Sequence, residues 1–216
     1  MDFAAMFDTW RNVLLRPGEE VFVEEKARPT GTLGTALIWM IVAAVIAAIL
    51  GWLRVQMMGD VMGGMEQIFA SAELPPEARA QIATMFGAAV GAASLWSIIL
   101  VPIGFLITVA VLHLLASVLG GSGDFGKMGY LRAAYQAPLI ILSSLVGLIP
   151  FLGGCISFLL WLYGFVLTYF AVKVNYNLTS GRAIAVVLIP LAVVLILTLC
   201  AAFAFAGILV SIIGNQ

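Results

Sequence analysis

Charge is scarce in this chain of 216 residues. Only 10% of the residues are Asp, Glu, Lys or Arg, whereas 63% are hydrophobic, and the formal net charge is −1. Soluble domains are about half apolar and about a quarter charged. The small net charge and the lack of a Lys/Arg-rich run argue against a nucleic-acid partner. The composition therefore indicates a protein whose main solvent is lipid.

Metal ligands and nucleophiles are also rare. The sequence has one His and two Cys, and no Asp or Glu follows Asp124. Cys155 and Cys200 lie far apart without C-x-x-C spacing, which favours apolar packing over a disulfide or a metal site. Nothing resembles a catalytic triad, a pair of intramembrane carboxylates or a zinc set. We expect no cofactor, no metal and no enzymatic activity.

The charge-free stretches indicate the fold class; they cover residues 29–53, 80–123, 133–172 and 183–216. A membrane-spanning helix needs about 20 apolar residues, and a helix satisfies its own backbone groups in lipid. The third stretch contains GLIPFLGG near its middle, which favours a hairpin of two spans. We predict an all-α polytopic membrane protein with five transmembrane helices, at about 33–53, 96–119, 133–149, 155–172 and 183–213.

The stretch 80–123 is long enough for two spans, or for one span preceded by a less apolar helix that starts at Pro76. The basic residues distinguish these readings, because cytoplasmic loops carry an excess of Lys and Arg. Five spans leave Arg54 and Arg79 on one side, whereas six spans divide the basic residues almost evenly. On the other side, five spans place Arg11, Arg16, Lys26, Arg28, Lys127, Arg132, Lys173 and Arg182. The count favours five spans, with a cytoplasmic N-terminus and a C-terminus on the opposite side.

The N-terminal segment has the pattern of an amphipathic helix that ends at Pro17-Gly18. Its apolar residues repeat at spacings of three and four: Phe3, Met6, Phe7, Trp10, Val13 and Leu14. Such a short helix cannot span the bilayer. It lies either in the cytoplasmic membrane interface or against the protein's own loops. We therefore divide the chain into a cytoplasmic segment, residues 1–28, and a membrane domain, residues 29–216.

The segment GSGDFG, residues 121–126, spells the G-x-G-x-x-G pattern of dinucleotide-binding loops. That motif needs a preceding strand and an acidic residue about 20 positions later. Here a membrane helix precedes the loop and no acidic residue follows it. We expect no nucleotide, and we interpret the glycines as allowing a tight turn beneath the membrane.

Two neighbouring motifs suggest a family. GYLRAAYQAP contains the Gly129-Tyr130 pair and Pro138, and WRNVLLRPGEEVF contains the Arg16-Pro17 break. With five spans, the chain from about Trp10 to the last span resembles the Yip family (the Ypt/Rab-interacting-protein domain) in its short bacterial form. The resemblance implies a non-enzymatic protein of the bacterial inner membrane, and it implies trafficking-type organisation with GTPase partners. In that membrane, the orientation that the basic residues predict makes the C-terminus periplasmic. The Asp-Leu-Tyr-Gly-Pro segment of eukaryotic members is absent.

Five residues form a candidate interaction surface for membrane lipids or a protein partner at the cytoplasmic face. They are Trp10, Asp124, Lys127, Tyr130 and Arg132. The alternative for the charged members is a solvated loop with weak local ion pairs.

His113 is the only histidine of the chain, and it is expected inside the second span. It is either a proton-relay group or a neutral imidazole bonded to a neighbouring helix, and the absence of an acidic partner in any span favours the second reading. Gly87 and Gly91 form a G-x-x-x-G that fits either a homo-oligomer seam or packing within one chain. A small transporter or channel subunit is the alternative function, with Pro102, Pro138 and Pro150 breaking helices along a path.

Overall fold

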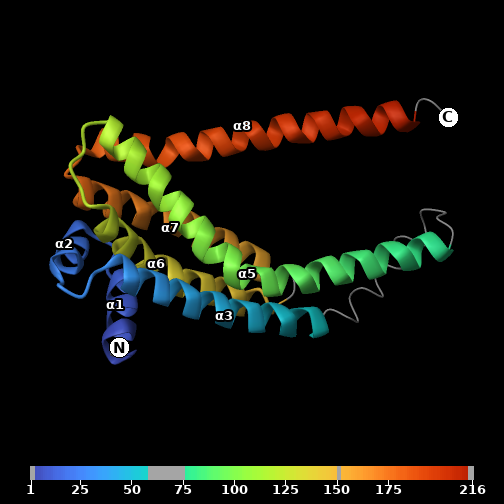
Figure 1. The fold of residues 1–216 in the computed structure, drawn as a ribbon, viewed down its shortest axis with the longest axis horizontal. Coiled ribbons are helices and arrows are strands. Elements are labelled where there is room, and N and C mark those ends of the chain that lie inside the picture. The colour runs from blue at the N-terminus through green and yellow to red at the C-terminus, as the bar shows by residue number, and fades with distance from the viewer. Residues whose placement is uncertain (1–2, 58–75, 150–151, 214–216) are drawn as a thin grey trace.

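The computed structural model describes residues 3–57, 76–149 and 152–213, and these residues form helices without any strand. This confirms the all-α prediction. The helices are α1 (Phe3–Leu15), α2 (Glu19–Ala27), α3 (Leu33–Met57), α5 (Pro76–Val118), α6 (Phe125–Val146), α7 (Leu152–Tyr176) and α8 (Ser180–Ile213). In Figure 1, α1 and α2 lie at one end of a bundle of longer helices, and α8 diverges from the bundle towards its C-terminal end.

Four described segments are long and apolar enough to cross a membrane: Leu33–Arg54, Trp96–Val118, Leu152–Tyr176 and Ser180–Phe203. They coincide with the first, second, fourth and fifth predicted spans. The protein is therefore a multi-pass membrane protein.

The third predicted span, 133–149, differs most from the structure. The corresponding helix, α6, begins at Phe125 and ends at Val146, and it is not among the four apolar segments. Its first half is polar in places, with Lys127, Arg132 and Gln136, and it lies mostly buried against other helices. A helix whose neighbours are protein rather than lipid needs no continuous apolar surface, which explains the low hydropathy.

The second predicted span is the last part of one continuous helix, because α5 runs without a break from Pro76 to Val118. The less apolar helix that the sequence predicts before this span is thus joined to it. Pro102 lies inside α5, and the helix changes direction about midway (Figure 1). Gly87 and Gly91 lie in the part of α5 whose side-chain surroundings are outside the described residues, so the oligomer seam stays a prediction. Pro150 also lies outside the described residues.

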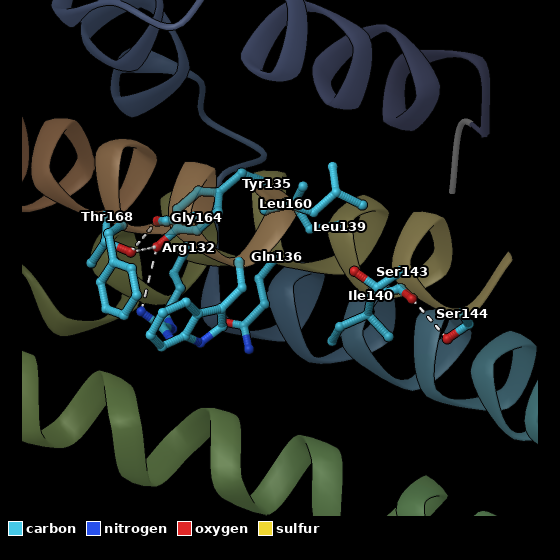
Figure 2. A pocket seen from close by; sticks show the side chains of 12 residues that line it. Arg132, Tyr135, Gln136, Leu139, Ile140, Ser143, Ser144, Leu160, Gly164 and Thr168 are labelled. Carbon is cyan, nitrogen blue, oxygen red and sulfur yellow. Dashed lines mark hydrogen bonds between the residues drawn. The ribbon is translucent and has the colours of Figure 1, made fainter. Parts of the chain in front are cut away.

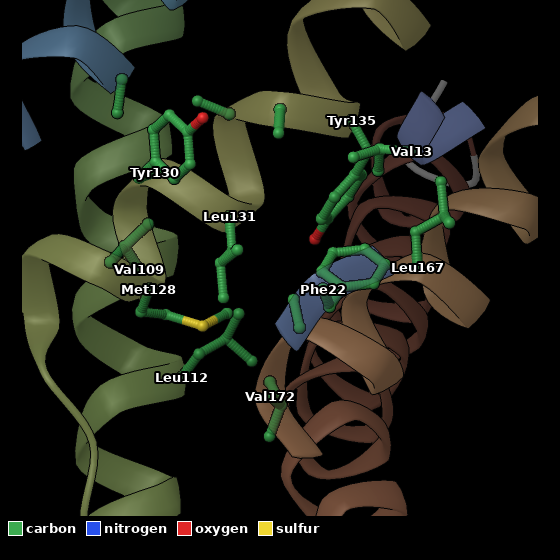
Figure 3. Packing of buried hydrophobic residues seen from close by; sticks show 14 of the residues in the cluster. Val13, Phe22, Val109, Leu112, Met128, Tyr130, Leu131, Tyr135, Leu167 and Val172 are labelled. Atoms are coloured by element: carbon green, nitrogen blue, oxygen red, sulfur yellow. The ribbon is translucent and has the colours of Figure 1, made fainter. Parts of the chain in front are cut away.

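A hydrophobic core joins α1 and α2 to the bundle. Figure 3 shows Phe22 of α2 beside Tyr135 of α6 and Leu167 of α7, with Met128 and Leu131 nearby. All five side chains are at most 2% exposed. The predicted boundary at residue 28 falls between α2 and α3, but the helices on both sides of it contribute to the same core.

Candidate interaction site

The predicted amphipathic face of α1 is divided between protein and surroundings. Met6, Trp10 and Val13 are buried against the bundle, at 4%, 5% and 0% exposure. Phe3 and Phe7 are 59% and 60% exposed. One side of α1 therefore docks onto the protein's own core, which is one of the two predicted alternatives. The side with Phe3 and Phe7 remains exposed and could lie in the membrane interface, which is the other alternative.

Aromatic rings continue this contact into α3 and α6. Trp10 meets Trp39 of α3 edge to face at 6.1 Å, and Trp39 lies 5.2 Å from the ring of Tyr130. The Tyr130 ring leaves no room for a side chain at Gly31, where an added Cβ would lie 2.9 Å from Cδ1. Gly129 is equally close-packed, because an added Cβ would lie 2.7 Å from Cδ1 of Leu33. The Gly129-Tyr130 pair of α6 therefore packs against the beginning of α3 and the residues just before it.

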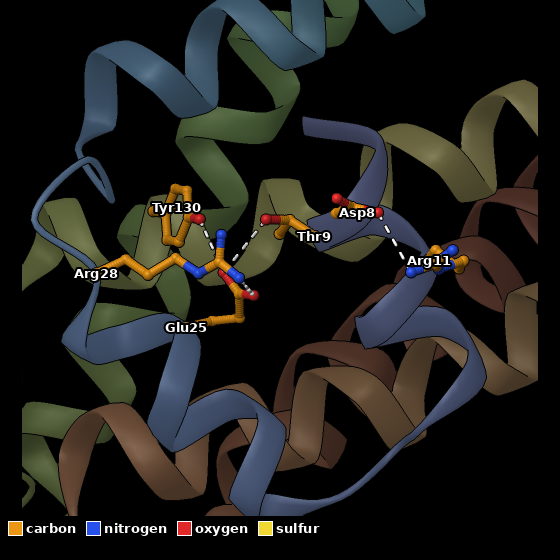
Figure 4. Close-up of polar contacts among 6 residues, drawn as sticks. All are labelled: Asp8, Thr9, Arg11, Glu25, Arg28 and Tyr130. Carbon is orange, nitrogen blue, oxygen red and sulfur yellow. Dashed lines mark hydrogen bonds and ion pairs between the residues drawn. The ribbon is translucent and has the colours of Figure 1, made fainter. Parts of the chain in front are cut away.

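A buried polar cluster lies beside these rings (Figure 4). The Tyr130 hydroxyl donates to Oε2 of Glu25 at 2.9 Å, and the Thr9 hydroxyl donates to the same oxygen at 3.5 Å. Arg28 pairs with Oε1 of Glu25 at 2.9 Å. The Glu25 side chain is only 2% exposed. Burial raises the pKa of its carboxyl, and the Tyr130 hydrogen bond and the Arg28 charge oppose that shift. The cluster ties α1, α2 and α6 together.

The glycine loop packs against the C-terminal end of α7. Gly120 follows α5 and has a φ of +83°. Its N–H donates to the Ser117 carbonyl, and the N–H of Gly121 donates to the Ala116 carbonyl, which together form a Schellman motif. A Cβ at Gly123 would lie 2.5 Å from Cδ1 of Tyr176 and 2.6 Å from the Asn175 carbonyl. The glycines of this loop therefore permit a close approach of α7, and protein fills the space beside Gly123.

Hydrogen bonds hold the loop in this position. The Ser122 N–H donates to the Tyr176 carbonyl at 3.1 Å, and the Asn175 side chain donates to the Asp124 carbonyl at 2.9 Å. Asp124 caps α6 by accepting from the Lys127 N–H at 2.7 Å. The G-x-G-x-x-G spelling is thus explained by packing and capping.

His113 lies against the same end of α7. Its Nδ1 is 2.7 Å from the Tyr176 hydroxyl, and its ring meets Phe125 edge to face at 5.5 Å. The neighbouring-helix hydrogen bond favoured by the sequence is therefore present.

Lysines fix α2 to the bundle. Lys26 donates from Nζ to the carbonyls of Val174 and Asn175, at 3.1 and 3.0 Å. These are carbonyls of the last turn of α7, where a cation is favourable. Lys127 donates from Nζ to the Arg28 carbonyl at 2.6 Å, and Lys173 pairs with Glu19.

The predicted interaction surface needs correction at two positions. Trp10 is 5% exposed and Tyr130 is 1% exposed, so both lie in the core and cannot present a surface. Asp124 is exposed, and Lys127 and Arg132 are half-buried. Trp10 is predicted at the surface because it belongs to the apolar face of α1, but that helix has a protein side and an outer side, and Trp10 is on the protein side. Tyr130 is predicted there because it lies next to the glycine loop, but its ring packs on Trp39 and its hydroxyl binds Glu25.

Sequence reasoning missed Glu25, Lys26, Asn175 and Tyr176. The i,i+3 spacing of Glu25 and Arg28 was a visible signal, because residues three apart are neighbours on a helix. Asn175 stands near the end of an apolar helix, where a buried amide usually has a hydrogen-bonding role. Within the described ranges, no group of three or more His, Cys, Asp or Glu could hold a metal ion.

These features define a class: a helical, multi-pass membrane protein whose soluble-like end carries two short docked helices. The model of the Yip1 domain matches residues 11–211, and the chain therefore belongs to the Yip1-domain family. The match covers the last part of α1, all of α2, the glycine loop and the Gly129-Tyr130 pair. No curated protein and no solved structure matches the chain.

Proposed function

We propose that this Yip1-domain protein is a non-enzymatic, five-span membrane protein that acts through lipid and protein contacts at its cytoplasmic face. The observation that carries the proposal is the layer formed by α1 and α2. Its inner side is built into the core, and its outer side leaves Phe3, Phe7, Leu15 and Val23 exposed, each by 55% or more. Large exposed apolar side chains at the edge of a membrane protein suit contact with lipid or with a partner.

The proposed third span, which completes the five, is α6. Its 22 residues correspond to about 33 Å of helix, which is enough for a hydrocarbon core of about 30 Å. It runs beside α3 (Figure 1), and Gly147, directly after α6, lies beside the Arg54 guanidinium near the far end of α3. Its polar first half faces protein, so crossing does not expose those groups to lipid.

The proposed orientation rests on the basic residues. The α1–α2 end of the bundle carries eight of the ten Lys and Arg residues, because the loops and helix ends that hold them meet there, and Arg54 lies at the other end. The excess favours a cytoplasmic α1–α2 end and a C-terminus on the opposite side. The resemblance to short bacterial Yip proteins favours the bacterial inner membrane, in which that side is the periplasm.

Reporter fusions test this orientation. We expect a fluorescent protein in the Gly121 loop to be active and alkaline phosphatase at Gln216 to be active. A phosphatase that is active in the loop, or inactive at the terminus, would contradict it.

Fluorescence quenching tests the lipid contact of α1 in the full-length protein. Cys155 and Cys200 are first replaced by Ser, and a single Cys at position 7 or 8 then carries a fluorophore. Both positions are exposed, but Phe7 belongs to the apolar side and Asp8 pairs with Arg11 in solvent. In liposomes containing lipids brominated near the head group, we expect strong quenching at position 7 and weak quenching at position 8. Weak quenching at both positions would show that the exposed side of α1 does not contact lipid, and a protein partner would then be the expected contact.

A further inference from the structure

A cavity of about 440 Å³ lies between α6 and α7. Figure 2 shows it lined along its length by side chains of both helices. Its volume is within the range of small-molecule sites, about 300–1,000 Å³. One lining residue, Tyr135, also packs against Phe22 of α2, whereas the hydrogen bonds and ion pairs that fasten α2 to the bundle involve no other lining residue.

One end of the cavity is polar. Arg132 donates from a guanidinium nitrogen to the Tyr135 hydroxyl at 3.4 Å, and that hydroxyl lies 2.8 Å from the Thr168 hydroxyl. Thr168 in turn donates to the Gly164 carbonyl at 2.6 Å. These bonds orient the guanidinium but leave most of its donors free.

Two buried polar atoms at this end have no hydrogen-bond partner: Nε of Arg132 and Oε1 of Gln136. Arg132 also takes part in no salt bridge within the described ranges, where the pairs are Arg11–Asp8, Arg28–Glu25 and Lys173–Glu19. A buried donor or acceptor without a partner is costly, and more so when it belongs to a charged group. The polar end therefore offers an unused cationic donor and an unused acceptor.

The middle of the cavity is apolar, and two serines, Ser143 and Ser144, line its other end (Figure 2). Leu139 and Ile140 of α6 face Leu160, Trp161 and Phe165 of α7 along it. Trp161 is 51% exposed, and its neighbours Phe158 and Leu162 are also exposed on a helix apolar enough to span a membrane. The cavity thus adjoins the surface that α7 presents to lipid.

The Arg132 end and the apolar middle of the cavity match the head group and the hydrocarbon chain of a membrane lipid. Arg132 lies five residues, about 7.5 Å along the helix, beyond Lys127, whose amine reaches Arg28 at the α1–α2 end. The polar end is therefore near the membrane face, and the apolar part extends towards the bilayer centre. Basic pockets between transmembrane helices are suited to anionic lipid head groups.

We propose that the α6–α7 cavity binds a membrane amphiphile with an anionic head group. The head group accepts hydrogen bonds from Arg132, and one hydrocarbon chain lies along Leu139, Leu160 and Trp161. A glycerophospholipid with a free hydroxyl in its head group uses both the Arg132 donor and the Gln136 acceptor, whereas a fatty-acid carboxylate uses only the first. The proposal depends neither on which face is cytoplasmic nor on the position of α1.

Lipid binding to full-length protein in a neutral detergent tests the proposal. Native mass spectrometry and apparent Tm are measured with added phosphatidylglycerol, with phosphatidylcholine of the same chains, and with oleate. We expect one phosphatidylglycerol per chain, a larger rise in Tm than with phosphatidylcholine, and weaker binding of oleate. If oleate binds more tightly than phosphatidylglycerol, the cavity is still a site for an anionic amphiphile, but its ligand is a fatty acid. Equal binding of phosphatidylglycerol and phosphatidylcholine would overturn it.

Two variants locate the site. Arg132→Gln should weaken phosphatidylglycerol binding about tenfold to a hundredfold, as expected for loss of a charged hydrogen-bonding partner. Arg182→Gln removes an exposed cation at the same end of the bundle, outside the cavity, and should bind as the wild type does. Equal losses in both variants, or no loss in Arg132→Gln, would overturn the proposal.

A third variant covers the case in which Arg132→Gln does not fold. Gly164 lines the cavity, and an added Cβ there makes only ordinary contact, 3.5 Å from Leu139. The Cβ of Gly164→Val is therefore accommodated, and its two methyl groups are expected to occupy the cavity and to reduce lipid binding with Arg132 intact; circular dichroism checks that the variant is folded. Unchanged lipid binding in a folded Gly164→Val protein would contradict the proposed position of the chain.

Discussion

The α1–α2 end of the bundle and the outer surface of α7 use the same residue types in opposite ways. Phe22 of α2 is fully buried among Tyr135 and Phe170, whereas Phe158 of α7 is 58% exposed beside Trp161. A membrane protein thus contains a region that must pack like a soluble core and a region whose packing partner is lipid.

We expect the largest difference between the two regions when a Phe is replaced by Ala in each of them. Phe22→Ala should cost about 3–5 kcal/mol, because it opens a cavity in a packed core. Phe158→Ala should cost far less, since lipid or detergent fills the vacated space. Thermal unfolding in detergent should show an apparent Tm lower by on the order of 10 °C for the first variant. Similar decreases for both would mean that the α7 surface is also a protein interface.

A smaller effect is expected from adding one methyl group. Gly123→Ala places a Cβ against Tyr176 and Asn175, and such overpacking costs about 1–3 kcal/mol. Gly181→Ala is the matched control, at the start of α8 near the same end of the bundle, because an added Cβ there meets nothing within 4 Å. Apparent Tm should fall for the first variant and stay level or rise for the second. A Gly123→Ala protein as stable as the wild type would show that the loop can move away from α7.

The smallest effect concerns the cap of α6. Asp124→Ala removes the acceptor for the Lys127 N–H and should cost about 1 kcal/mol. Asp124→Asn keeps a side-chain oxygen and should restore most of the loss. Chemical unfolding monitored by circular dichroism measures both. If Asn is as damaging as Ala, the charge of Asp124 contributes more than its hydrogen bond.

The amino-acid sequence by itself determined the class of protein and the approximate limits of four spans. Hydropathy and length are local properties, and a helix in lipid must satisfy its own backbone whatever its neighbours are. The Gly129-Tyr130, Pro138 and Arg16-Pro17 motifs also sufficed to suggest the Yip family, and the match over residues 11–211 confirms it. The rejection of a strand-based nucleotide fold followed from the helix that precedes Gly121.

Only the tertiary structure decided which side of each helix meets protein. The Asp124 cap begins α6 at Phe125, and the contacts of α6 with α3 and α7 explain why polar residues are tolerated before residue 133, where the predicted span begins. Trp10 and Tyr130 are core residues because α1 docks across the bundle end, and Glu25 is tolerated in the interior because Tyr130, Thr9 and Arg28 converge on it. These contacts join residues up to about a hundred positions apart, as Tyr130 and Glu25 are, and sequence periodicity reports the faces of a helix but not the neighbour of each face.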